Sequence, residues 1–160
     1  MSQTVAEVMT RDLIMVEPQT PIKEAIKLIA QHRISGLPVV DEAGKLVGII
    51  SETDLLWQET GIEPPVYIMF LDSVIYLENP TRYDRELHKA LGQTVGDVMS
   101  DEPSTVKPDQ PLRKAARLMQ EKSIRRLPVV DDSGKVIGIL TPGDIVRAMA
   151  AKFDEQAEKG

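Results

Sequence analysis

Apolar residues recur at helical spacing in two parts of the chain. One stripe follows Pro21 and the other follows Pro111, and proline is well tolerated at the first helical position because its missing N–H would have no partner there. The sequence therefore predicts two helices that begin at these prolines and bury one face each. The stripes consist of Ile22, Ala25, Ile26 and Ile29, and of Leu112, Ala115, Ala116 and Met119.

Two apolar runs flank a polar turn after each of these helices, which is typical of a β-hairpin. A short extended segment also precedes each helix. Pro18 or Pro108 ends that segment, because proline cannot donate a hydrogen bond to a neighbouring strand. The predicted extended segments are residues 14–16, 37–40 and 45–50 in one half, and 104–106, 127–130 and 135–140 in the other.

Four capping-box patterns mark further helix starts. Thr4 with Glu7 and Thr94 with Asp97 predict a short lead-in helix in each half. A hydroxyl residue three positions before an aspartate opens the last helix of each half, which we expect to run to Leu56 or to Ala150. These two pairs are Ser51 with Asp54, and Thr141 with Asp144.

The two halves are copies of one unit. Residues 3–56 align without a gap with residues 93–146, and 21 aligned residues are identical, whereas unrelated segments would share about three. The predicted fold class is α/β (α+β), with two pseudo-symmetric β-α-β-β-α repeats packed sheet to sheet. The predicted organisation is a first repeat at 1–56, an insert at 57–92, a second repeat at 93–150 and a C-terminal tail at 151–160.

The insert at 57–92 belongs to neither copy and is more apolar than a plain linker needs to be. It contains a mostly apolar segment at 66–77 and a predicted helix from Pro80 to Leu91. Two interpretations remain open. The insert either adds to the core of its own module or forms part of a dimer or partner interface.

Composition and charge exclude several classes of function. A net charge of -6 disfavours nucleic acids and anionic membranes as partners, because both require a surplus of Lys and Arg. The absence of cysteine excludes disulfides, thiolate metal sites and cysteine nucleophiles. Neither a signal peptide nor an apolar run near the ~20 residues of a membrane span is visible. We therefore expect a cytoplasmic protein with no membrane insertion.

The residues shared by the two copies resemble a tandem pair of cystathionine beta-synthase (CBS) domains, also called a Bateman module. The shared set is Val-Met, then Pro and Ala in the helix, Leu-Pro-Val-Val-Asp, Gly-Lys, Gly-Ile and a hydroxyl residue three before Asp. It occurs twice, in the same order, over roughly two-thirds of the chain. The resemblance implies a regulatory module whose two clefts hold AMP, ADP, ATP or S-adenosylmethionine, and which commonly forms a homodimer.

Carried over to this sequence, the resemblance implies one ligand site in each repeat. A carboxylate in a first helical turn, such as Asp144, can accept both ribose hydroxyls, while Thr141 and the helix N-terminus suit phosphate oxygens. The candidates in the second repeat are Thr105, Val106, Arg125, Arg126, Leu127, Pro128, Thr141 and Asp144. Those in the first repeat are Met15, Val16, Ser35, Gly36, Leu37, Pro38, Ser51 and Asp54.

The two candidate sites are unequal. Arg125 and Arg126 can form charge-assisted contacts to phosphate in the second repeat, where the first repeat has Ser35 and Gly36. Simpler interpretations remain open for all of these residues. The hydroxyl–aspartate pairs also serve as helix caps, and the arginines as solvated surface residues.

The sequence therefore predicts a non-catalytic sensor that binds an adenosyl ligand and controls a separate effector protein. His32 and His88 lie in different elements without a catalytic partner, and Gly44 with Gly48 forms no phosphate-binding loop. We expect no catalytic residue, no metal and no required cofactor. The alternative is a ligand-free structural module for dimerisation or adaptor binding, and an enzyme acting on adenine nucleotides is a distant third.

Overall fold

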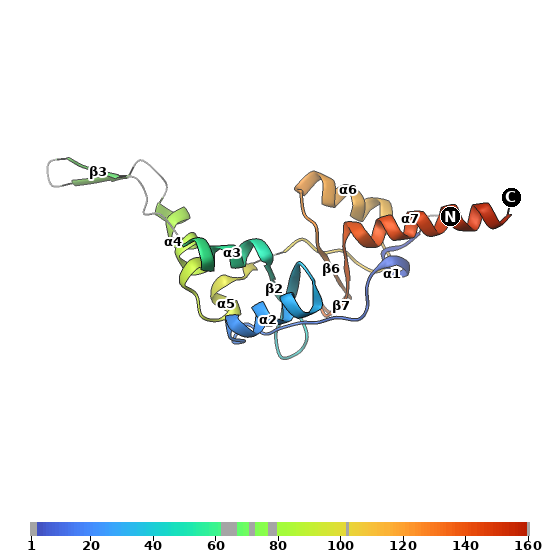
Figure 1. Cartoon of the computed structure of the whole chain (residues 1–160), viewed down its shortest axis with the longest axis horizontal. Helices are drawn as coiled ribbons and strands as arrows, with labels where there is room; N and C mark the ends of the chain where they lie inside the picture. Colours follow the sequence, from blue (N-terminus) through green and yellow to red (C-terminus); the bar gives the residue numbers. More distant parts are fainter. Residues whose placement is uncertain (1–2, 62–66, 71–72, 77–79, 102, 160) are drawn as a thin grey trace. The chain divides into compact units, whose positions relative to one another are not determined.

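The computed structural model describes residues 3–61, 67–70, 73–76, 80–101 and 103–159, and the chain forms two compact units (Figure 1). Unit 1 comprises Met1–Met15, Val40–Gly48 and Asp101–Gly160, and unit 2 comprises Val16–Val39 and Ile49–Ser100. These units differ from the sequence repeats. Unit 1 combines the body of the second repeat with the first lead-in segment and with Val40–Gly48 of the first repeat, and unit 2 combines the rest of the first repeat with the second lead-in segment.

Unit 1 is built around the second repeat. Its elements are α1 (Val5–Val8), α6 (Leu112–Lys122), the antiparallel hairpin of β6 (Leu127–Val130) and β7 (Val136–Leu140), and α7 (Pro142–Lys159). Two residues of the first lead-in segment, Val5 and Met9, lie in the same buried cluster as residues of the second repeat. The second-repeat members of that cluster are Val106, Ala115, Met119, Leu127, Val129 and Leu140.

Unit 2 has the corresponding arrangement around the first repeat. Its helices are α2 (Ile22–His32), α3 (Glu52–Thr60), α4 (Pro80–Leu91) and α5 (Val95–Val98). Strands β1 (Gly36–Val40), β2 (Leu46–Ser51) and β5 (Ser100–Asp101) form a three-stranded sheet in the order β1-β2-β5, and unit 2 contains β1 up to Val39, β2 from Ile49 and Ser100 of β5. Helix α5 belongs to the second repeat in sequence, but it lies in this unit and its Val95 and Val98 are fully buried.

Backbone hydrogen bonds attach each lead-in helix to the repeat that it completes. In unit 1, the N–H of Val5 donates to the carbonyl of Gln110 at 2.9 Å, and Thr4 bridges Pro111. In unit 2, the N–H of Val95 donates to the carbonyl of Thr20 at 2.8 Å. These contacts satisfy N–H groups at the starts of short helices that are too short to be stable alone.

The hairpins β1–β2 and β6–β7 occur where the sequence predicts them. In each turn an aspartate carboxylate accepts two backbone N–H groups: Asp41 from Ala43 and Lys45, and Asp131 from Ser133 and Lys135. Gly44 and Gly134 have φ values of +83° and +86°, in the left-handed region that favours glycine. The extended segments predicted at 14–16 and 104–106 are reduced to single parallel bridges at Val16 and Val106.

Three predictions about helix ends are wrong. Pro21 and Pro111 have ψ values of 141° and 137°, so they cap α2 and α6 from outside instead of occupying the first helical position. Thr4 makes no side-chain cap, and the N–H of Glu7 donates to the Thr4 carbonyl at 3.2 Å. The last helix of each half continues past its predicted end: α3 runs to Thr60 instead of Leu56, and α7 runs to Lys159 instead of Ala150, so residues 151–159 are helical.

The insert contains the predicted helix, α4, over Pro80–Leu91. It also contains an antiparallel hairpin of β3 (Tyr67–Phe70) and β4 (Ser73–Tyr76), in which Tyr67 pairs with Tyr76. The sequence predicted an apolar segment there but no strands, and residues 66, 71–72 and 77 of that segment lie outside the described residues. Helix α4 packs against α3 and α5, so this part of the insert adds to unit 2.

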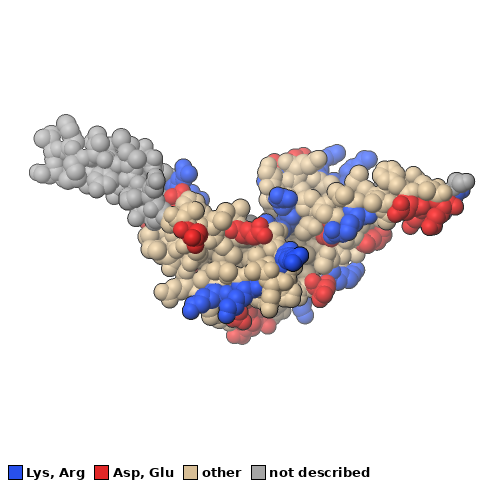
Figure 2. All heavy atoms as spheres, in the orientation of Figure 1, with Lys and Arg blue, Asp and Glu red and all other residues tan. Residues whose placement is uncertain are grey.

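Helix α7 has an unusual surface for an amphipathic helix. Val146, Met149 and Phe153 are all exposed at helical spacing, which places them on one face. Acidic side chains gather at the C-terminal end of the same helix (Figure 2), and they belong to Asp154, Glu155 and Glu158. In the described part of the chain, no helix is both long and apolar enough to cross a membrane.

Candidate functional site

The carboxylate of Asp144 lies in the first turn of α7 and is only 7% exposed. Its Oδ2 atom accepts hydrogen bonds from the backbone N–H of Thr141 at 3.0 Å and from the Thr141 hydroxyl at 3.1 Å. In return, the Thr141 hydroxyl oxygen accepts the N–H of Asp144 at 3.3 Å. The capping role predicted for this pair is therefore present, and it engages one carboxylate oxygen.

The second oxygen of Asp144 has two other donors. The hydroxyl of Thr10 donates to Oδ1 at 3.0 Å, and the Nη2 atom of Arg147 donates to it at 2.7 Å. Thr10 is held beside β7 because its backbone exchanges hydrogen bonds of 2.9 and 3.0 Å with Ile139. The lead-in segment thus brings a hydroxyl to the aspartate of the other repeat.

The remaining second-repeat candidates lie in the same compact unit as Asp144. Val106, Leu127 and Pro128 are buried, and the N–H of Val106 donates to the carbonyl of Pro128 at 3.1 Å. Thr105 and Arg125 are exposed, and Arg126 is half-buried. Val106, Leu127 and Pro128 therefore belong to the packed interior, whereas Thr105 and the arginines reach solvent.

In unit 2, Ser51 and Asp54 repeat the same local geometry at the start of α3. Asp54 Oδ2 accepts the N–H of Ser51 at 2.9 Å and the Ser51 hydroxyl at 3.0 Å. The N–H of Asp54 points back to Ser51 Oγ at 3.4 Å, which completes a capping box. Both residues are buried. The capping role is therefore present in this repeat as well.

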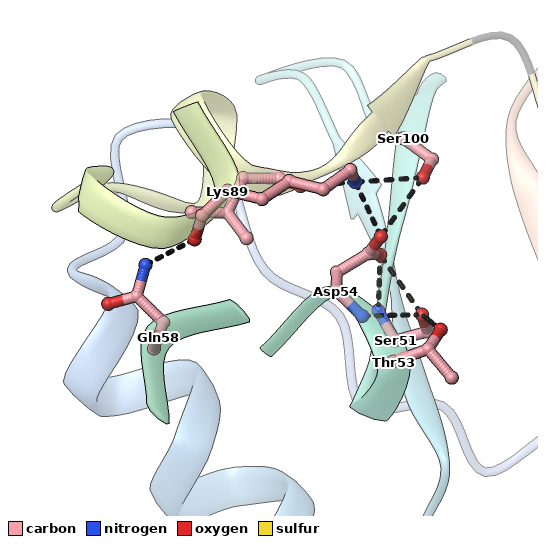
Figure 3. A network of polar contacts seen from close by, with 7 residues as sticks. Ser51, Thr53, Asp54, Gln58, Lys89 and Ser100 are labelled. Carbon is pink, nitrogen blue, oxygen red and sulfur yellow. Dashed lines mark hydrogen bonds and ion pairs between the residues drawn. The ribbon is translucent and has the colours of Figure 1, made fainter. Parts of the chain in front are cut away.

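The second oxygen of Asp54 meets a different cation (Figure 3). The hydroxyl of Ser100 on β5 donates to Asp54 Oδ1 at 3.3 Å and is the counterpart of Thr10. The ammonium of Lys89, from α4 of the insert, donates to the same oxygen at 2.5 Å. Asp54 is thus ion-paired with a residue that lies outside the repeat.

The other first-repeat candidates lie in β1 or close to it in the chain or the fold. The N–H of Val16 donates to the carbonyl of Pro38 at 3.1 Å, and Val16, Gly36, Leu37 and Pro38 are buried. Ser35 is half-buried and its carbonyl accepts the N–H of Glu52 at 3.0 Å. Met15 is exposed. Apart from Met15, these candidates lie in the same compact unit as Asp54.

Sequence reasoning missed four residues that contact the two aspartates: Thr10, Ser100, Lys89 and Arg147. Thr10 and Ser100 lie 90 positions apart, as all repeat counterparts do, and both carry a hydroxyl, so the alignment contained their signal. Lys89 carried no such signal because the insert has no second copy. Across the described residues, no group of three or more His, Asp and Glu side chains could hold a metal ion.

Two solved structures with bound adenosyl compounds are similar to this chain. The crystal structure of CBSX2 in complex with AMP is 38% identical, has a TM-score of 0.79, and the match covers 92% of this chain and 97% of that chain. The CBS domain pair of protein MJ0100, in complex with 5-methylthioadenosine and S-adenosyl-L-methionine, is 28% identical with a TM-score of 0.68. That match covers 95% of this chain and 99% of the other.

Family membership follows from the sequence as well. The CBS domain-containing protein CBSX1, chloroplastic, of Arabidopsis thaliana is 40% identical over 149 residues. That match covers 91% of this chain but 63% of the relative, so the chain spans less than two-thirds of that protein. Residues 5–58 and 95–151 each match the family described as CBS domain. The chain therefore belongs to the CBS-domain family and carries two CBS domains in tandem, with a mixed helix and strand fold.

Proposed function

We propose that this protein is a regulatory module that binds an adenosyl ligand and controls a separate partner protein without catalysing a reaction. The candidate ligands are AMP, ADP, ATP and S-adenosylmethionine. Two observations support the proposal: similar CBS pairs have been solved with AMP or S-adenosylmethionine, and Asp144 is buried with its carboxylate oriented by Thr141 and Thr10. The buried and oriented carboxylate of Asp144 is the observation that selects the second-repeat site.

Each residue of the second-repeat site has a distinct proposed role. Asp144 accepts the two ribose hydroxyls through Oδ1, after Arg147 has moved aside. Thr141 and the N-terminus of α7 hold phosphate oxygens, because N–H groups there lack partners within the helix. Arg125 and Arg126 pair with phosphate charge, and Thr105 lines the opening. The backbone at Val106, Leu127 and Pro128 forms the wall against the base.

The proposed signal is a shift between two conformations. A ligand can bias such an equilibrium only through its different affinity for the two states. The candidate set includes a hydroxyl from the first lead-in segment, Thr10, and a carboxylate from the second repeat, Asp144. A ligand that replaces this hydrogen bond removes a contact between the lead-in segment and α7. The lead-in segment would then change position, and a partner protein would bind the two conformations with different affinity.

Calorimetric titration tests the binding site. We expect wild-type protein to bind at least one of the four candidate ligands, and Asp144→Asn to weaken that binding about 10-fold or more, since hydrogen bonds to charged groups contribute about 1.5–3 kcal/mol. Asp97→Asn is the matched control, because Asp97 belongs to a capping box of the same geometry outside the candidate site. Equal losses of ligand affinity in both variants would show that Asp144 acts only as a helix cap.

The arginines are tested with ligands that differ only in phosphate. Arg125→Gln and Arg126→Gln should each lower the affinity for AMP about 10-fold and leave the affinity for adenosine nearly unchanged, because the lost contact is made to phosphate alone. A parallel loss of adenosine affinity would show that the substitutions disturb the fold near Leu127 and Pro128. Release of adenosine or inorganic phosphate during these titrations would revive the enzyme interpretation.

We further propose a homodimer that uses the exposed face of α7. Val146 is 62% exposed, and its repeat counterpart on α3, Leu56, is 60% exposed, so each repeat presents an apolar residue at the same position. Sedimentation should give a dimer for the wild type and a monomer for Val146→Glu with Phe153→Glu. A dimer in protein that binds none of the ligands would favour the alternative function, a ligand-free structural module.

The effector and the compartment remain proposals. The acidic net charge favours a protein partner over a nucleic acid. A cytoplasmic location stays a prediction, since the relative CBSX1 is described as chloroplastic. Affinity capture with and without the bound ligand, followed by identification of the proteins whose recovery changes, tests whether the signal reaches another polypeptide.

A further inference from the structure

The hydrogen-bonding positions of Lys89 and Asp54 are all occupied by protein groups. Its ammonium donates to Asp54 Oδ1 at 2.5 Å, to the carbonyl of Val98 at 3.1 Å and to the Ser100 hydroxyl at 3.4 Å (Figure 3). An ammonium has three N–H donors, so each donor of Lys89 has an acceptor in the protein. The Asp54 carboxylate accepts two hydrogen bonds from Ser51, one from Lys89 and one from Ser100. A carboxylate has about four acceptor positions, so none is left.

Helix α4 is fixed where it carries Lys89. The amide of Gln58 on α3 donates to the carbonyls of Lys89 at 2.5 Å and Gly92 at 3.2 Å, which satisfies the C-terminal end of α4. Gly92 lets the chain after α4 pass close to Val98 of α5, because a Cβ atom at this position would lie 2.7 Å from Val98 Cγ2. Hydrogen bonds therefore hold both the backbone and the side chain of Lys89.

The two aspartates differ in how easily their cation can leave. The Lys89 side chain is 22% exposed, whereas that of Arg147 is 73% exposed and lies on the same helix as its partner. Because the guanidinium of Arg147 is mostly solvated, little is lost when it releases Asp144 to a ligand. A partly buried ammonium with three protein acceptors loses all of them when it is displaced.

We propose that Lys89 blocks the first-repeat site by occupying the Asp54 carboxylate in place of a ligand. The chain then binds one adenosyl ligand, at Asp144. This inference rests on the proposed function, because it assigns Asp54 the same potential role as Asp144. The insert then has a task that neither repeat can perform. It supplies the cation that makes two copies of one site unequal.

The principal test is the stoichiometry of AMP binding. Wild-type protein should bind one AMP per chain, and Lys89→Met, which retains the aliphatic side chain without its charge, should bind two. Adding Asp54→Asn to Lys89→Met should return the stoichiometry to one. Arg147→Met is the matched control: it removes the corresponding cation at Asp144 and should leave one site per chain with altered affinity.

A second measurement does not depend on a Lys89 variant being folded. If Lys89 closes the first-repeat site, Asp54→Asn alone should leave the stoichiometry and affinity of AMP unchanged. Loss of one AMP on Asp54→Asn would mean that the first site is open in the wild type and would overturn the proposal. Two sites in the wild type, or weaker binding in Lys89→Met, would also overturn it and make Lys89 a ligand contact.

These outcomes separate the inference from the function on which it rests. If the wild type binds AMP once and folded Lys89→Met still binds it once, the function stands and the closing role of Lys89 fails. If neither protein binds any of the four adenosyl ligands, both fail. Binding by Lys89→Met in the absence of wild-type binding would support the closing role and would contradict the site at Asp144.

Discussion

Gly138 determines how closely the first lead-in segment approaches β7. A Cβ atom at this position would lie 2.4 Å from the sulfur of Met9 and 3.2 Å from the carbonyl of Thr10. Met9 belongs to the core of unit 1, and Thr10 donates to Asp144. The absence of a side chain at Gly138 therefore serves both the packing of unit 1 and the position of the hydroxyl at the candidate site.

We expect Gly138→Ala to lower the free energy of unfolding by about 1–3 kcal/mol, the usual cost of overpacking a core. Urea denaturation measures this change. Gly143→Ala is the control: its nearest neighbours include the guanidinium end of the Arg147 side chain, so it should be neutral or stabilise α7 by a few tenths of a kcal/mol, roughly. Similar losses in both variants would contradict the packing argument.

The residues of the candidate site were predictable to different degrees. Ser51, Asp54, Thr141 and Asp144 form a local pattern within one turn, so the sequence identifies both their pairing and their helix starts. Thr10 and Ser100 meet these aspartates only through long-range folding, although they align with each other. Lys89 depends on how α4 packs against α3, which no spacing within the sequence reveals.

The lead-in helices provide a matched pair of helix starts. Thr94 accepts the N–H of Asp97 on its hydroxyl oxygen at 3.3 Å, whereas Thr4 makes no side-chain cap. We expect Thr94→Ala to cost about 1 kcal/mol of stability and Thr4→Ala clearly less, since capping hydroxyls typically contribute that much. Thermal and urea unfolding of the two variants compare them directly. Equal effects would show that the cap hydrogen bond is unimportant.

Asp97 should make the protein sensitive to acid. The backbone N–H of Thr94, followed by its hydroxyl and the N–H of Gln93, lowers the pKa of Asp97 below its usual value of 3.8. A lowered pKa in the folded state means that the stabilisation is present above the unfolded pKa and is lost as the pH falls through the folded pKa. Asp97→Asn should therefore lose less stability than the wild type between about pH 6 and about pH 3.

Elements with a strong local pattern were predictable, and the exceptions have physical causes. The hairpins follow from aspartate and glycine in their turns, and α4 is found at its predicted bounds. Pro21 and Pro111 lie one position outside their helices because their ψ angles are extended. Helix α7 continues to Lys159 because residues 151–159 contain no proline, and its only glycine lies in the first turn.

Ligand binding should stabilise the whole molecule in a predictable way. A ligand that binds only the folded chain adds RT ln(1 + [L]/Kd), about 2.7 kcal/mol per site at 100 times Kd. If Lys89 closes the first site, AMP at that concentration should raise the free energy of unfolding of the wild type by this single increment. Urea unfolding with and without AMP measures it, and an increment twice as large would contradict binding at one site.

At the scale of the whole molecule, the sequence predicted two repeats but not the exchange of segments between them. The alignment of residues 3–56 with 93–146 treats each lead-in helix as part of its own repeat. The apolar faces of α1 and α5 indicate that they are buried, but identical patterns in the two copies fit either repeat equally well. Only the backbone contacts of Val5 with Gln110 and Val95 with Thr20 decide the partner.

That exchange has a consequence for how such a chain can arise. A single repeat cannot complete its own core, because the helix that fills it comes from elsewhere. An ancestor of one repeat would have obtained the missing helix from a second molecule, as in domain swapping. Gene duplication and fusion convert that swap into an intramolecular event at high effective concentration. Once fused, the two copies are free to diverge, and if Lys89 closes the first site, a single lysine in the connecting segment distinguishes them.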